Sequence, residues 1–347
     1  MAKIISTIGR TLSKNVRVLQ TTSSNPFFNL SYEELMYRKH PCDATTLYLW
    51  RNSPNVVIGR HQNPYKECNL TNMQKDNVEL VRRKSGGGTV YQDYGNAIFS
   101  IVSPGLMDNK HNNNKILLSA LKTIGINAEA TGRNDITVDG KKISGSAFRL
   151  ERDLFLHHGT MLLNLNFQNL KKYVTPNKAK MESKGVSSVE ARVSNVSDIV
   201  GRDVTYEEWC DALKKSFTDN YGVAIPTEYI KESDYKNNSE LNNIMNERTS
   251  KDWRYGNNCD FKYKMETRFT WGTIDVNIEA EKGKITQIKI YSDCLNPAMI
   301  EDIQSTLLGV EFKHDAISKT LHKLADINKP PVDEHIKEFL EWFVKNL

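Results

Sequence analysis

Short apolar runs separated by turn residues dominate the first half of the chain, from Val16 to about Leu165. Runs of this length, bounded by Gly, Pro, Asn and Asp, are typical of β-strands. Leu47–Trp50 and Val56–Gly59, joined by the polar stretch Arg51–Asn55, predict a hairpin. Asp139-Gly140, between two β-forming stretches, predicts another hairpin with a tight turn.

Helical spacing of apolar residues appears at three places in the first two thirds of the chain. One helix is predicted to begin near Asn29, and others cover Lys115–Ile124 and Tyr206–Tyr221. Between Pro226 and Lys251 the sequence becomes polar and rich in asparagine. We interpret this segment as the seam between two domains, part helix and part linker.

A compact pattern of strands and helices follows the seam. Arg268–Glu279 alternates as a strand, a turn follows, and Ile285–Tyr291 returns as a second strand. Asn296-Pro297 supplies an N-cap and a first-position proline for a helix. Further helices are predicted at Asp315–Ala325 and Val332–Asn346. The tail is therefore expected to form a small α+β module.

Composition restricts the class of protein. The chain has 347 residues, 39% hydrophobic and 26% charged, which is enough for two domains with buried cores. A net charge of +5 favours an anionic small molecule or an acidic protein as partner over a nucleic acid. No apolar stretch approaches the roughly 18 residues that span a bilayer, so we expect no membrane partner. The five cysteines are widely spaced and form no C-x-x-C pair, which favours a reducing compartment over a disulfide framework or a zinc site.

The N-terminal segment has a composition of its own. No acidic residue precedes Glu33, and Lys3, Arg10 and Lys14 lie opposite an apolar stripe at helical spacing. An acid-free, basic, amphipathic start is typical of a mitochondrial transit peptide. The alternative is an ordinary basic terminus before the first strand, which leaves a cytoplasmic location open.

The segment Val81–Tyr91 carries the most informative motif, RRKSGGGT. Consecutive glycines allow backbone amides to approach a ligand, and such amides form an anion-binding turn. The motif predicts a cradle for a phosphate or a carboxylate, and the alternative is a flexible turn with incidental basic neighbours. A P-loop and a G-x-G-x-x-G opening a helix are both absent from the sequence.

A second group of residues surrounds the predicted tight hairpin. The hairpin places Lys142 on a strand before small residues, where its charge can stabilise a phosphate or an activated carboxyl group, although most lysines are merely solvated. Asp135 and Asn96 offer oxygen atoms to Mg²⁺ or to a sugar, and each is alternatively a turn residue. His157 and His158 should point to opposite faces of a strand, which makes them a poor metal pair.

Together these motifs resemble the lipoate–protein ligase A family. The resemblance rests on RRKSGGGTVYQDYGN, WRNSPNVVIGRHQNPYKECN, GRNDITVDGKKISGSAFR, HHGTMLLNLN and KGVSSVEARVSN, and on RFTWGTIDVNIEAEKGKITQIKIYSDCLNPA in the tail. It extends from about Val16 to the end of the chain. A Ser-His-Asp hydrolase is not supported, because the G-x-S-x-G turn is absent from the sequence.

The resemblance implies an α+β fold in two domains. Residues 15–256 would form a catalytic domain like that of class II synthetases and biotin ligases, with a mixed sheet and flanking helices. Residues 257–347 would form a small α+β accessory domain, and residues 1–14 would be the transit segment. The protein would act as a monomer.

The resemblance also implies an ATP-dependent ligase reaction with Mg²⁺. (R)-Lipoate would attack ATP to give lipoyl-AMP and pyrophosphate. The lipoyl group would then pass to a lysine of an apo lipoyl carrier domain, in the E2 subunits of 2-oxoacid dehydrogenases or the H protein of glycine cleavage. By motif position, Lys142 would be the catalytic lysine. Lipoate would contact Arg83, Ser85, Gly86, Gly87, Lys142 and His158. ATP and lipoyl-AMP would contact Arg83, Gly88, Thr89, Val90, Tyr91, Asn96, Asp135 and Lys142, with Mg²⁺ near Asp135.

Three alternatives remain open at this point. A lipoyltransferase would use only pre-made lipoyl-AMP, and an octanoyltransferase would take its acyl group from a carrier thioester without ATP. A non-catalytic protein would bind an anion or a nucleic acid, and it predicts clustered basic residues interleaved with aromatic ones. Pyrophosphate release and the effect of Lys142→Ala separate these alternatives.

Overall fold

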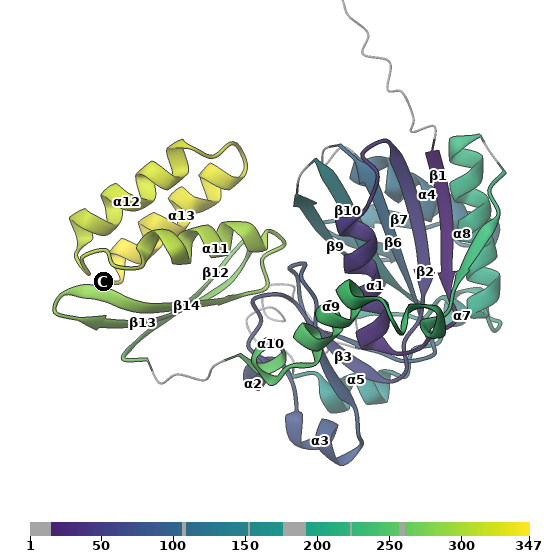
Figure 1. Ribbon diagram of the computed structural model, residues 1–347, viewed down its shortest axis with the longest axis horizontal. Coiled ribbons are helices and arrows are strands. Elements are labelled where there is room, and N and C mark those ends of the chain that lie inside the picture. The colour runs from purple at the N-terminus through teal and green to yellow at the C-terminus, as the bar shows by residue number, and fades with distance from the viewer. Residues whose placement is uncertain (1–14, 106–108, 152, 176–191, 223, 257–260) are drawn as a thin grey trace, which may run out of the picture.

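The computed structural model describes residues 15–105, 109–151, 153–175, 192–222, 224–256 and 261–347. The chain forms a larger unit around a mixed sheet and a smaller C-terminal unit beside it (Figure 1). The predicted transit segment, residues 1–14, lies outside the described residues. The predicted domain boundary falls next to residues 257–260, which are also outside them. Within the described part of the chain, no helix has the length and apolar character needed to cross a membrane.

The larger unit is built on an eight-stranded sheet of order β11-β1-β2-β6-β10-β9-β8-β7. Its strands are β1 (Asn15–Thr21), β2 (Ala44–Trp50), β6 (Asn96–Pro104), β7 (Glu129–Thr131), β8 (Asp135–Val138), β9 (Lys141–Glu151), β10 (Leu154–Leu162) and β11 (Thr227–Ile230). β1 runs parallel to both of its neighbours, and the other pairs are antiparallel. The predicted mixed sheet is confirmed.

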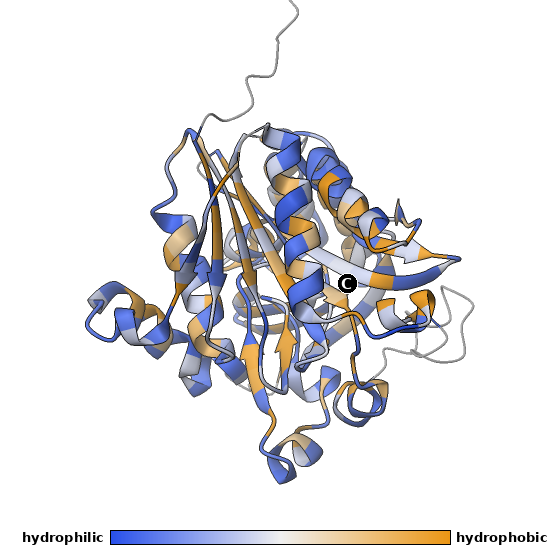
Figure 2. Cartoon of the chain, turned by 90° about the vertical axis from the view of Figure 1, so that its right-hand side faces the viewer, coloured by the Kyte–Doolittle hydropathy of each residue, from blue (hydrophilic) through white to orange (hydrophobic). Residues whose placement is uncertain are grey.

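Strand β2 shows how the sequence places helices on both faces of this sheet. Leu47 and Leu49 pack on the side of α4 (Asn109–Thr123) and α8 (Tyr206–Tyr221). Tyr48 and Trp50 pack on the other side with α1 (Pro26–Arg38) and α9 (Ser239–Thr249). All seven residues of β2 are buried, which is why its last four, Leu47–Trp50, form an unbroken apolar run instead of alternating with polar residues. Figure 2 shows apolar segments along the strands between these helices.

A second, three-stranded sheet of order β4-β3-β5 lies below the first and carries the glycine-rich loop. Its strands are β3 (Asn55–Ile58), β4 (Glu79–Arg82) and β5 (Val90–Gln92), with α2 (Pro64–Glu67), α3 (Leu70–Lys75) and α5 (Phe167–Tyr173) beside them. The predicted hairpin between Leu47–Trp50 and Val56–Gly59 is wrong, because β2 and β3 belong to different sheets. The connecting Asn52 is fully buried and bonds Gln92 across the two sheets, which favours the crossover.

The predicted helices exist, with changes at some ends. α1 begins at Pro26 rather than near Asn29, because the Asn25 side chain accepts hydrogen bonds from the amides of Phe27 and Phe28. α4 begins six residues before Lys115, and α8 has the predicted bounds. A short helix, α7 (Val196–Val200), precedes α8.

The predicted seam at Pro226–Lys251 is wrong, because this segment is part of the larger unit. It contains β11, the 3-10 helix η2 (Glu232–Tyr235) and α9, and α10 (Lys251–Tyr255) follows directly. Leu241 and Ile244 of α9 pack in the core beneath α1. A few apolar residues suffice here, since the asparagines serve as surface and capping residues, as Asn238 does for α9.

The C-terminal unit has its own core. Its elements are β12 (Tyr263–Phe269), β13 (Gly272–Glu281), β14 (Lys284–Ser292), α11 (Pro297–Leu307), α12 (His314–Asp326) and α13 (Val332–Lys345). The small α+β module and the Asn296 cap are confirmed. The single strand predicted at Arg268–Glu279 is instead the end of β12, a turn, and most of β13, because the chain reverses at residues 270–271 and Phe269 pairs with Gly272 in an antiparallel register.

Candidate active site

A cavity of about 1050 Å³ lies between the two sheets of the larger unit and the C-terminal unit. Its size suits a small-molecule ligand. Ten of the twelve predicted site residues lie in its wall: Arg83, Gly87, Gly88, Thr89, Val90, Tyr91, Asn96, Asp135, Lys142 and His158. The other two, Ser85 and Gly86, lie directly behind that wall in the same loop. Leu30, Trp50, Val57, Ile98 and Leu162 add an apolar surface.

Lys142 lies near the start of β9, where the predicted tight hairpin places it. Asp139 and Gly140 adopt left-handed backbone angles, with φ of 48° and 74°, and connect β8 to β9. The Lys142 Nζ atom lies 2.7 Å from Asp135 Oδ1. A Cβ atom on Gly145 would come within 2.5 Å of the same Nζ. Gly145 therefore leaves the space through which the lysine reaches the carboxylate.

The buried Arg83 side chain holds the glycine-rich loop in place through hydrogen bonds to its backbone. Its guanidinium donates hydrogen bonds to the carbonyl oxygens of Gly86 and Gly88, both at 2.7 Å, and to that of Val57 at 3.3 Å. Burial lowers the pKa of Arg83 to about 10, so the side chain stays charged at neutral pH. Its donors hold the loop in shape. Arg83 also lines the cavity, so the direct ligand contact that the resemblance implies stays a prediction.

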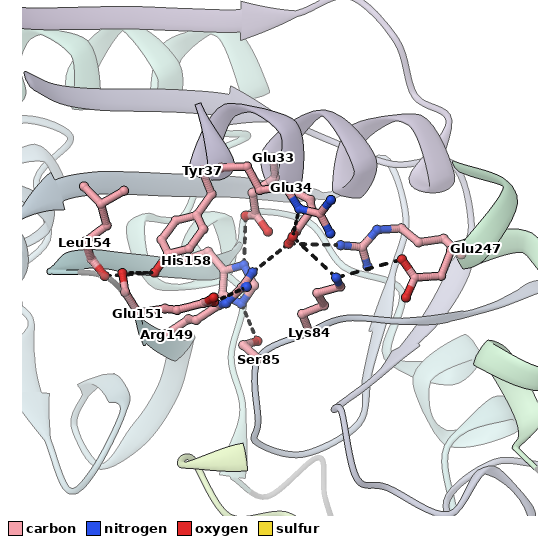
Figure 3. Close-up of polar contacts among 12 residues, drawn as sticks. Glu33, Glu34, Tyr37, Lys84, Ser85, Arg149, Glu151, Leu154, His158 and Glu247 are labelled. Carbon is pink, nitrogen blue, oxygen red and sulfur yellow. Dashed lines mark hydrogen bonds and ion pairs between the residues drawn. The ribbon is translucent and has the colours of Figure 1, made fainter. Parts of the chain in front are cut away.

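A buried chain of three polar side chains lies behind the loop (Figure 3). Ser85 Oγ lies 2.7 Å from His158 Nε2, and His158 Nδ1 lies 2.8 Å from Glu33 Oε1. Burial alone would raise the pKa of Glu33. The nearby His158, together with hydrogen bonds from His158 and Ser100, outweighs burial and lowers it. Ser85 is outside the cavity wall. The hydrogen-bonded side chains Ser85, His158 and Glu33 therefore orient the loop and do not offer a nucleophile to a ligand.

Glu33 was not among the predicted site residues. The signal that could have found it is a pair of carboxylates, Glu33 and Glu34, between Leu30 and Leu35 in a helix whose residues are nearly all buried. A buried carboxylate needs partners, so an acidic pair inside an apolar stretch indicates a polar network. The neighbouring Glu34 carboxylate forms ion pairs with several basic side chains (Figure 3).

The adjacent histidines point to opposite faces, as predicted. His157 Nε2 lies 2.8 Å from Ser146 Oγ, and the His157 ring contacts the ring of Phe148. Burial lowers the pKa of His157 to about 3. No group of three or more His, Cys, Asp and Glu side chains suited to hold a metal occurs in the described part of the chain.

The part of the cavity where the resemblance predicts a nucleotide contains an unsatisfied acceptor. Asn96 is 1% exposed, and its Oδ1 atom has no hydrogen-bond partner among the residues that the structure describes. Thr89 Oγ1 donates to Gln62 Oε1 at 3.0 Å. The Tyr91 ring packs against Tyr173 in the core beneath, so its predicted contact with a ligand is restricted to its cavity-facing part. An orphaned buried carbonyl oxygen beside a cavity fits a ligand that brings a donor.

The C-terminal unit closes the cavity over the glycines. The Gly87 amide donates to the Cys294 carbonyl oxygen at 3.1 Å. A Cβ on Gly86 would lie 2.1 Å from that oxygen, so only glycine allows this approach. Glu266, Arg268, Asp275 and other residues of the C-terminal unit join the wall. None of these was predicted as a site residue, because their position depends on how the two units meet.

Two family models match the chain in succession. The model of the lipoyl protein ligase A/B catalytic domain matches residues 25–218, and that of the bacterial lipoate protein ligase C-terminus matches residues 258–343. The chain belongs to the lipoyl protein ligase family. A lipoate-protein ligase A of Psychrobacter cryohalolentis is 38% identical to this ligase over 337 residues, which cover 95% of this chain and 98% of that protein.

Solved structures agree with this membership. P. falciparum LipL1 in complex with lipoate is 32% identical and has a TM-score of 0.85, covering 95% of this ligase and 100% of that chain. A bipartite lipoate protein ligase from Thermoplasma acidophilum, described with its E2 lipoyl domain, is 27% identical, with a TM-score of 0.61 over 72% of this ligase and 99% of that chain. A lipoate-protein ligase A bound with ATP is also 27% identical, with a TM-score of 0.61. The match covers 70% of this ligase and 99% of that chain.

Proposed function

We propose that this ligase activates lipoate with ATP and transfers the lipoyl group to a lysine of a lipoyl carrier domain. The observation that carries the proposal is the shared cavity, which joins an apolar surface to a lysine–aspartate pair and a glycine-rich loop. Related structures with bound lipoate and with bound ATP support both substrates. The relative described with its E2 lipoyl domain supports the acceptor.

In the first step, a lipoate carboxylate oxygen attacks the α-phosphorus, and pyrophosphate leaves. The acyl chain would lie along the apolar wall near Trp50 and Leu162. The Lys142 ammonium would leave Asp135 for the α-phosphate, where it stabilises the charge that develops in the transition state. The Asn96 carbonyl oxygen would accept a hydrogen bond from the nucleotide. Positioning and charge stabilisation suffice, because the step needs no side-chain nucleophile.

Mg²⁺ fits this site as a companion of ATP. The ion usually takes one or two protein carboxylates and fills its remaining positions with phosphate oxygens and water. Asp135 would supply the carboxylate once Lys142 has moved to the phosphate. Bound there, Mg²⁺ would neutralise phosphate charge.

In the second step, the ε-amine of the carrier lysine attacks the acyl carbon of lipoyl-AMP. The bond between that carbon and the phosphate oxygen breaks, AMP leaves with the electron pair, and the amine releases its proton to water. Lys142 remains beside the departing phosphate and stabilises its charge. The C-terminal unit, which covers the glycine-rich loop, would limit the access of water to the adenylate.

The test supplies an apo lipoyl carrier domain with three acyl donors in separate reactions: lipoate with MgATP, pre-made lipoyl-AMP, and an octanoyl carrier thioester. The proposal predicts carrier modification with the first two. Modification with lipoyl-AMP alone would show a lipoyltransferase, and modification with the thioester alone would show an octanoyltransferase. Lys142→Ala should abolish the reaction with lipoate and MgATP while the far-UV circular dichroism spectrum stays unchanged.

A further inference from the structure

Among the residues that the structure describes, most polar contacts between the two units run in one direction, from donors of the larger unit to acceptors of the C-terminal unit. These contacts are Gly87 N to Cys294 O at 3.1 Å, Lys66 Nζ to Glu266 at 3.0 Å and to Asp275 at 2.7 Å, and Arg60 Nε to Glu301 at 3.0 Å. His61 Nε2 also lies 3.2 Å from the Pro297 carbonyl oxygen. One contact runs the other way, from the Ser292 amide to the His61 carbonyl oxygen. Carboxylate and carbonyl oxygens of the C-terminal unit thus accept hydrogen bonds from an amide, an ammonium and a guanidinium group of the larger unit, which are groups that also bind anionic ligands.

Two of these donors, Gly87 and Lys66, belong to the cavity wall. Lys66 lies in α2, next to Glu67, whose carboxylate lies 3.4 Å from Thr89 Oγ1. The Asp275 side chain is only 10% exposed, so a largely desolvated carboxylate is held on the Lys66 ammonium. Arg60 and Glu301 are similar in chemistry, but neither lines the cavity.

We propose that Lys66 is a second phosphate-binding lysine, which binds the β- and γ-phosphates of ATP, and that Glu266 and Asp275 compete with these phosphates for it. The proposal rests on the proposed function. Carboxylate and phosphate oxygens are both anionic acceptors for an ammonium group. The two carboxylates therefore accept the same Lys66 hydrogen bonds that phosphate oxygens would accept.

The charges of the cavity wall leave a role for such a residue. Lys142 is assigned to the α-phosphate, and the Arg83 donors are engaged by loop carbonyls. The pyrophosphate that leaves in the first step carries more charge than one lysine balances, and Lys66 would act on it beside Mg²⁺ and the arginines of the wall, Arg133, Arg192 and Arg268. Lys66 can supply that charge without a change in the loop, because its partners belong to the other unit. ATP binding would then weaken one contact between the two units.

Binding of MgATP to the full chain, measured by calorimetry without lipoate, tests the proposal. Lys66→Ala should weaken MgATP binding about tenfold, the size of one charge-assisted hydrogen bond. Glu266→Gln with Asp275→Asn should tighten it about threefold, because the competitors are gone. AMP has no β- or γ-phosphate, so Lys66→Ala should leave AMP binding unchanged.

Arg60→Ala and Glu301→Gln are the matched controls, since they break a bridge between the two units outside the cavity. If Lys66 is only a tether, its removal and the removal of its carboxylate partners will change MgATP binding in the same direction, and the proposal is overturned. Unchanged binding by Lys66→Ala also overturns it. Glu266→Gln alone keeps the test valid if the buried Asp275→Asn does not fold. A wild-type chain that binds no MgATP would instead refute the proposed function.

Discussion

Glu34 is the centre of a buried cluster of four basic side chains in the larger unit, and its neutralisation gives a quantitative prediction. Its carboxylate is 3% exposed and lies 2.6 Å from both Arg38 and Arg149, 3.4 Å from Lys84 and 3.7 Å from Arg248. These residues come from α1, β9, the glycine-rich loop and α9. Figure 3 shows Arg149 and Lys84 directed at the Glu34 carboxylate. Glu34→Gln keeps the shape of the side chain and removes the charge that four cations share.

The magnitude follows from the pKa of Glu34. Burial alone would raise it, but Arg149, Lys84 and Arg248 outweigh burial and lower it from 4.5 to about 2. At about 1.4 kcal/mol per pKa unit, this shift corresponds to about 3 kcal/mol of folding stability at neutral pH. Losing one partner of a buried ion pair typically costs a similar amount, about 3–5 kcal/mol. We therefore expect Glu34→Gln to destabilise the larger unit by about 3 kcal/mol.

Urea unfolding, followed by tryptophan fluorescence from pH 7 down to pH 3, measures this effect. Because the folded-state pKa is lowered, the stabilisation is complete above the unfolded pKa of 4.5 and is lost as the pH falls towards 2. The difference between wild type and Glu34→Gln should shrink accordingly below pH 4.5. Glu228→Gln, which breaks an exposed pair with Arg17, is the control and should cost less than about 1 kcal/mol. A Glu34→Gln variant as stable as this control at pH 7 would refute the reasoning.

Three further predictions concern the loop, the hairpin and the N-terminus. Gly145→Ala should displace the Lys142 ammonium, because its Nζ lies 2.5 Å from the new Cβ position. Adenylation, measured by pyrophosphate release, should slow by at least about tenfold while the variant stays folded. Gly86→Ala should push the Cys294 carbonyl away and separate the two units, which small-angle scattering would detect as an increased radius of gyration; an unchanged radius would argue against this contact. If residues 1–14 are a transit segment, N-terminal sequencing of the protein from its host organelle should begin after them, and an intact Met1 would argue against cleavage.

Local signals predicted most of the elements, because the residues that decide them are neighbours in sequence. The Asp139-Gly140 turn, the Asn296 cap and the helical spacing of Tyr206–Tyr221 each depend on a few adjacent side chains, and all three are confirmed. The pairing of strands depends on distant residues instead. Leu47–Trp50 and Val56–Gly59 look like a hairpin locally, yet each is buried on both faces by elements far along the chain.

The candidate site was predictable where one motif carries several residues. The glycine-rich loop and the Asp135–Lys142 hairpin meet in one cavity, as a shared ligand would require. Glu33, Lys66 and Asp275 were not predicted, because each acquires its place from a partner in another element. The Asn-rich stretch before Lys251 was wrongly predicted to be partly a linker. Its polarity suggested a linker, whereas its few apolar residues are enough to pack it under α1.

The formation of lipoyl-AMP without a carrier domain tests the central claim most directly. Purified chain, lipoate and MgATP are mixed, and both pyrophosphate and the adenylate are quantified for wild type and for Lys142→Ala. We predict stoichiometric pyrophosphate and lipoyl-AMP with the wild type, and neither product with Lys142→Ala. A wild-type chain that binds lipoate and MgATP but releases no pyrophosphate would contradict the assignment of an adenylating ligase.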